Sequence, residues 1–142
     1  MEIFNTHRLT QKQRFNTAIV LGTLAAFVIG IVTGYLRLII ASTVGFDFSV
    51  VTIAAGYAVG MVIQKLGRGV QLKFSILGGI LGFIAVSVSN VIAFGYPIFF
   101  IFNIAIHFHI ILTLISGSLN TILMLLYQSI AVYVAFNTSR II

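Results

Sequence analysis

Charged residues are scarce in this sequence, and it contains neither cysteine nor tryptophan. Only 7% of the 142 residues are charged, whereas about a quarter is usual in soluble domains. The 60% of residues that are hydrophobic cannot all be covered by polar groups in so small a water-soluble domain. Lipid must cover the remaining apolar surface. The sequence therefore predicts an all-α, polytopic transmembrane helical bundle that forms a single domain over residues 1–142.

The lack of cysteine excludes disulfide bonds, a thiolate nucleophile and a cysteine-ligated metal. Acidic residues are almost as rare, because only Glu2 and Asp47 oppose the basic residues and the net charge is +6. In a soluble protein this excess would indicate nucleic-acid binding. Here the basic residues stand at the ends of apolar runs, as membrane-orienting charges do, so we expect no nucleic-acid partner.

Eight basic residues are expected to set the topology or to contact lipid headgroups. They are Arg8, Lys12, Arg14, Arg37, Lys65, Arg68, Lys73 and Arg140.

Four apolar runs have the length of membrane spans, since about 20 helical residues cross the roughly 30 Å hydrocarbon core. The predicted spans are 17–36, 48–64, 74–94 and 118–137. The third run stops at Gly95 and Pro97, the single proline, which cannot continue a helix.

A further apolar segment, residues 98–116, is long enough to be a fifth span. The alternatives are an interfacial segment, which lies in the membrane interface, and a re-entrant segment, which dips into the membrane. Four spans place seven of the eight basic residues on one side, and five spans place six there. The positive-inside rule therefore favours four spans with the N-terminus, and with it the C-terminus, in the cytoplasm.

Small residues recur every four positions in three of the runs, which places them on one face of each helix and lets helix backbones approach closely in lipid. These predicted helix-packing residues are Gly22, Ala26, Gly30, Gly34, Gly56, Gly60, Gly78 and Gly82. The faces either hold the chain's own bundle together or pair subunits, and the long stripe of the first run would then be the pairing face.

Uncharged polar residues inside the predicted spans either form hydrogen bonds between helices or line a solute pathway. The candidates are Ser87, Asn90, Asn120 and Gln128. No ionisable residue lies deep in these spans, and proton-coupled transporters usually place one there.

Arg37 and Asp47 flank the connection between the first two spans. Arg37 is expected to extend to lipid headgroups, with a weak, exposed ion pair to Asp47 as the alternative. His107 and His109 point in different directions on a helix and have no acidic or thiol neighbour, so we expect no metal site. Ser118 suits the N-cap of the last helix better than a catalytic serine.

No nucleophile–base pair or metal-ligand cluster stands out, so we expect no enzyme and no cofactor. The sequence predicts a non-catalytic, multi-pass protein of the cell membrane. Its expected partners are the lipid bilayer and other membrane-protein subunits or further copies of itself. A small homo-oligomeric channel or transporter, with a pathway lined by uncharged polar residues, is the alternative.

Overall fold

The computed structural model describes residues 10–68 and 70–141, and this part of the chain is helical apart from short connections. Five α-helices and one 3₁₀ helix occur within these residues. They are α1 (Gln11–Val44), α2 (Val51–Gly67), α3 (Leu72–Ala93), η2 (Ile98–Phe102), α4 (Ile104–Ser116) and α5 (Leu119–Thr138). The predicted all-helical fold is confirmed.

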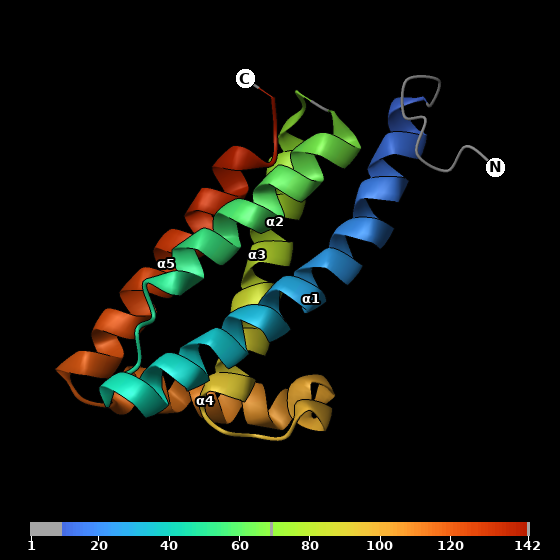
Figure 1. Ribbon diagram of the computed structural model, residues 1–142. Helices are drawn as coiled ribbons and strands as arrows, with labels where there is room; N and C mark the ends of the chain where they lie inside the picture. The colour runs from blue at the N-terminus through green and yellow to red at the C-terminus, as the bar shows by residue number, and fades with distance from the viewer. Residues whose placement is uncertain (1–9, 69, 142) are drawn as a thin grey trace.

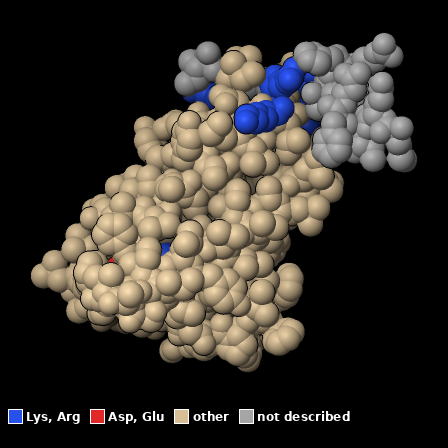
Figure 2. All heavy atoms as spheres, viewed as in Figure 1, with Lys and Arg blue, Asp and Glu red and all other residues tan. Residues whose placement is uncertain are grey.

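Helices α1, α2, α3 and α5 run alternately in opposite directions and form one bundle (Figure 1). Helix α3 is the central element, because it contacts α1, α2, α4 and α5. The start of α1, the connection between α2 and α3, and the end of α5 meet at one end of the bundle. We call this the basic end, because Lys and Arg side chains gather there (Figure 2). Helix α4 lies across the opposite end (Figure 1).

Helices α1, α3 and α5 are long and apolar enough to cross a membrane. Helix α2 has 17 residues and α4 has 13, so both are shorter apolar helices. The predicted spans 48–64, 74–94 and 118–137 coincide with α2, α3 and α5 to within three residues at each end.

Helix α1 extends beyond the predicted span 17–36 at both ends, because it has 34 residues and is about 51 Å long. It starts at a capping box, in which the backbone N–H of Gln13 donates to Thr10 Oγ1 and that of Thr10 donates to Gln13 Oε1. It ends at Val44, seven residues beyond Arg37, and the next residue, Gly45, takes the left-handed φ of 83° that glycine adopts at little cost.

The eight predicted helix-packing residues are all buried, and they lie at contacts between helices of this chain. Gly22, Gly30 and Gly34 of α1 face α3. Gly56 and Gly60 of α2 face α5, as do Gly78 and Gly82 of α3. Gly78 also faces Ser139, the residue that follows α5. The α1 stripe that was considered for pairing subunits therefore lies inside the chain. How much these contacts stabilise the bundle stays a prediction.

Candidate functional site: a buried polar network

Arg37 is the starting point of the site, because its side chain is completely buried although it carries a charge. Its Nε donates to Asp47 Oδ1 at 3.0 Å, and Nη2 donates to Asp47 Oδ2. Asp47 follows the left-handed turn at Gly45, which brings the connection back over α1. The Asp47 side chain is 16% exposed. The result is a two-pronged ion pair, the geometry in which Arg and a carboxylate bind most strongly.

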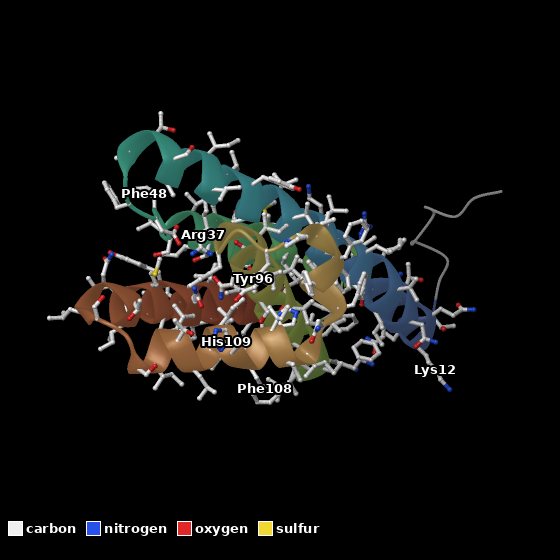
Figure 3. All side chains as sticks on the ribbon, turned by 90° about the horizontal axis from the view of Figure 1, so that it is seen from below. Lys12, Arg37, Phe48, Tyr96, Phe108 and His109 are labelled. Atoms are coloured by element: carbon white, nitrogen blue, oxygen red, sulfur yellow. The ribbon has the colours of Figure 1, made fainter. Side chains whose placement is uncertain are left out.

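Helix α3 supplies the next two partners of Arg37. Its Nη1 donates to Asn90 Oδ1 at 2.8 Å and to Ser89 Oγ at 3.3 Å. The guanidinium thus makes four hydrogen bonds to side-chain oxygens of three residues. In the end-on view, Arg37 lies between α1 and α5 (Figure 3).

Helix α5 closes the network through Gln128, whose amide pairs reciprocally with that of Asn90. Asn90 Nδ2 donates to Gln128 Oε1 at 3.0 Å, and Gln128 Nε2 donates to Asn90 Oδ1 at 2.9 Å. Both side chains are buried. One continuous set of hydrogen bonds therefore links α1, the α1–α2 connection, α3 and α5.

The expectation that Arg37 extends to lipid headgroups is wrong, as is the alternative of an exposed ion pair. A buried guanidinium without partners would cost several kcal/mol, so the polar atoms around it are what allow it to remain inside. The sequence did carry a signal for this burial. Gly30, Gly34 and Arg37 follow one another at the i, i+4, i+7 spacing of one helix face, so Arg37 continues the face that packs on α3.

Two of the four predicted polar residues, Asn90 and Gln128, meet in the network. Ser87 does not join it: it is half-buried and lines cavities beside α4. Asn120 lies exposed in the first turn of α5. The serine that reaches Arg37 is Ser89, which the sequence analysis did not identify.

The two histidines of α4 have separate environments. His107 Nε2 lies 2.8 Å from the carbonyl oxygen of Ile101 and so ties α4 to η2. His109 is exposed on another face of the helix (Figure 3). Asn103 begins α4, since its side-chain oxygen accepts a hydrogen bond from the backbone N–H of Ala105. These contacts shape the η2–α4 corner.

The basic residues other than Arg37 lie at or next to the ends of helices that meet at the basic end. Within the described residues these are Lys12, Arg14, Lys65, Arg68, Lys73 and Arg140. Arg8 lies outside the described residues. Lys73 Nζ stands 5.0 Å from the ring centroid of Phe15 and 5.6 Å from that of Phe74, so cation–π contacts hold it. Charge is therefore separated along the bundle. Exposed and half-buried cations lie at one end, and a neutralised ion pair lies inside toward the other.

Comparisons with protein-family models, with curated proteins and with solved structures found no match for this chain. Function must therefore be argued from the network, the distribution of charge and the surface of the bundle.

Proposed function

We propose that this protein is a non-catalytic, four-pass integral membrane protein of the cell membrane that acts as a subunit or partner in a larger membrane assembly. The observation that carries the proposal is the mutual satisfaction of the buried polar side chains around Arg37. Asp47, Arg37, Asn90 and Gln128 hydrogen-bond to one another. Side chains committed in this way stabilise a bundle, and they are poorly placed to bind or transform a substrate.

The direction of the helices and the distribution of charge support four passes. Helices α1, α2, α3 and α5 alternate in direction, so each basic connection returns to the same end of the bundle. The positive-inside rule puts that end in the cytoplasm. Helix α2 would span about 26 Å, a mismatch that local thinning of the bilayer accommodates at modest cost.

The three faces of α4 support an interfacial position for this helix. Ile110 and Leu114 pack against the bundle, whereas Ile104, Phe108 and Ile115 are more than 60% exposed. His109 and Ser116 are exposed on a third, polar face. A helix of 13 residues spans about 20 Å, too little for the hydrocarbon core. An interfacial helix with one apolar side toward lipid and one polar side toward water accounts for this pattern.

A partner surface is available on η2 and α4. Phe99, Phe102 and Phe108 are 84%, 75% and 64% exposed and lie on the segment that crosses the end of the bundle. Exposed aromatic side chains are common anchors at protein interfaces. The glycine faces are already used inside the chain, so we place the contact with another subunit on this aromatic surface.

The channel alternative has less support. A cavity of about 290 Å³ between α3, α4 and α5 reaches Asn90 and Gln128, but most of its lining is apolar. The two amides that face it already pair with each other. A solute would have to break these hydrogen bonds to use them.

Purification in a mild detergent, followed by mass measurement of the intact complex, tests the assembly role. We expect another membrane polypeptide to co-purify at fixed stoichiometry. Phe99→Ser together with Phe108→Ser should release it, because the aromatic surface would be lost. The control variant Leu24→Ser changes an apolar residue of α1 that is about as exposed as Phe108 and should retain the complex. A pure homo-oligomer, or a complex indifferent to the two phenylalanines, would contradict the proposal.

A further inference from the structure

The contact between α2 and α5 near the basic end is bordered by two adjoining cavities that share Gln64. The backbones approach closely here, since a Cβ built on Gly60 would meet Thr138 and, at 3.1 Å, the carbonyl oxygen of Ala135. One cavity, of about 330 Å³, is lined by Tyr57, Met61, Gln64, Asn137, Thr138 and Arg140. The other, of about 470 Å³, is lined by Gln64, Lys65, Arg68 and Ile141. We call the two together the α2–α5 groove.

The chemistry of the α2–α5 groove changes along its length. Met61 and Tyr57 lie about one and two helical turns before Lys65, on the side of the groove away from the end of α2. Amide groups of Gln64 and Asn137 follow. Cations from Lys65, Arg68 and Arg140 complete the groove at the basic end. A ligand that fits this order has an apolar part, a polar middle and an anionic head.

Arg140 provides an independent sign that an acceptor belongs in the groove. Its Nε is buried and has no hydrogen-bond partner among the described residues. Its backbone is held in place, because Gln64 Nε2 donates to the Arg140 carbonyl oxygen at 3.1 Å. A buried guanidinium N–H without an acceptor is costly, and such groups usually find a partner. A phosphate oxygen is the acceptor that Arg binds most readily.

Electrostatics favours an anion in spite of the helix dipoles. Helices α2 and α5 both end here, so their last carbonyl groups bring partial negative charge. Three full positive charges line the groove against these partial charges. The one acidic residue in the described part of the chain, Asp47, is paired with Arg37. It belongs to the connection between α1 and α2, which lies at the other end of the bundle (Figure 1).

We propose that the α2–α5 groove binds the phosphate headgroup of an anionic phospholipid, with an acyl chain lying along Met61 and Tyr57. The inference rests on the proposed position in the bilayer, because only that position puts the basic end at the level of the headgroups. It places a specific lipid on one face of the bundle. Lys12, at the same end but on α1, takes no part in it.

Native mass spectrometry of the detergent-purified chain with added lipid tests the site. Phosphatidylglycerol should remain bound at least fivefold more than phosphatidylcholine. Lys65→Gln and Arg140→Gln should each weaken phosphatidylglycerol binding about fivefold, which corresponds to about 1 kcal/mol for each cation near a lipid phosphate. Arg140→Lys keeps the charge but lacks the Nε–H, so it should restore only part of the binding that Arg140→Gln loses. The matched control Lys12→Gln removes the same charge from the same end and should leave binding unchanged.

Three results would overturn the proposal. The first is equal retention of phosphatidylglycerol and phosphatidylcholine, and the second is equal weakening of phosphatidylglycerol binding by Lys12→Gln and Lys65→Gln. The third is displacement of the lipid by millimolar glycerol 3-phosphate, which would indicate a soluble phosphorylated ligand. Size-exclusion profiles matching the parent establish that each variant is folded. A separate experiment extracts cell membranes with alkaline carbonate, and release of the parent chain from the membrane would refute the proposed position in the bilayer. The lipid-binding measurements on the parent chain and its variants test the α2–α5 groove itself.

Discussion

Replacing Asp47 with alanine is expected to destabilise the folded chain by about 3–5 kcal/mol. The substitution removes two of the four hydrogen bonds of Arg37 and leaves a buried guanidinium without its counter-charge. The penalty is large because the buried guanidinium cannot reach water unless the structure opens. Titration with sodium dodecyl sulfate in mixed micelles measures the free energy of unfolding.

Two further variants separate the ion pair from general damage to the connection. The double replacement Arg37→Met and Asp47→Leu should recover most of the lost stability, because two apolar side chains remove both the charge and its need for a partner. Thr43→Ala changes an exposed residue of the last turn of α1 and should shift stability by less than about 0.5 kcal/mol. If Asp47→Ala were as stable as the parent chain, or the double variant no better than the single one, the network would not have the role assigned to it.

Replacing Gly56 with alanine is expected to separate α2 from α5 and to cost at least about 2–3 kcal/mol. A Cβ at this position would collide with the backbone of Ala131, including its carbonyl carbon at 2.7 Å. Backbone atoms of a packed helix cannot turn aside as the tip of a side chain can. The loss of folded protein after heating, followed by size-exclusion chromatography, measures the effect.

Gly79→Ala is the matched control for this prediction. Gly79 also lies in the middle of a helix, but a Cβ there would stand 3.5 Å from the ring of Phe136, an ordinary contact. Alanine favours helix by about 1 kcal/mol over glycine, so this variant should be as stable as the parent or slightly more so. Equal losses from both substitutions would mean that close approach of α2 and α5 does not decide the effect.

The long apolar runs predicted most of the helices, since the bounds of three of the four expected spans agree with those of α2, α3 and α5. Of these three helices, α2 is shorter than the helices that are long enough to cross a membrane. Arg37 shows where that approach fails. A charge after 20 apolar residues normally marks the end of a span, and the partner that keeps Arg37 inside the bundle belongs to the next connection. Pairing of this kind depends on tertiary structure, which cannot be predicted from the hydropathy of one segment.

The site shows the same limit at Asn90 and at residues 98–116. The sequence named Asn90 and Gln128 among the polar residues inside the predicted spans, but only the packing of α3 against α5 makes them partners 38 positions apart. For residues 98–116, hydropathy predicted a continuous stretch long enough to span. The extended backbone of Asn103, which caps α4, divides it into η2 and α4. Because the backbone changes direction at Asn103, this segment forms a short helix across the end of the bundle and not a fifth helix of spanning length.

Labelling of single engineered cysteines in intact cells is the most direct test of the four-pass arrangement, and the natural sequence has no cysteine to interfere. Ser42→Cys, at the end of α1, and Gln71→Cys, between α2 and α3, are both exposed positions. A membrane-impermeant maleimide should label position 42 in intact cells and position 71 only after the membrane is permeabilised. Labelling of position 71 in intact cells, or of both positions alike, would contradict the account.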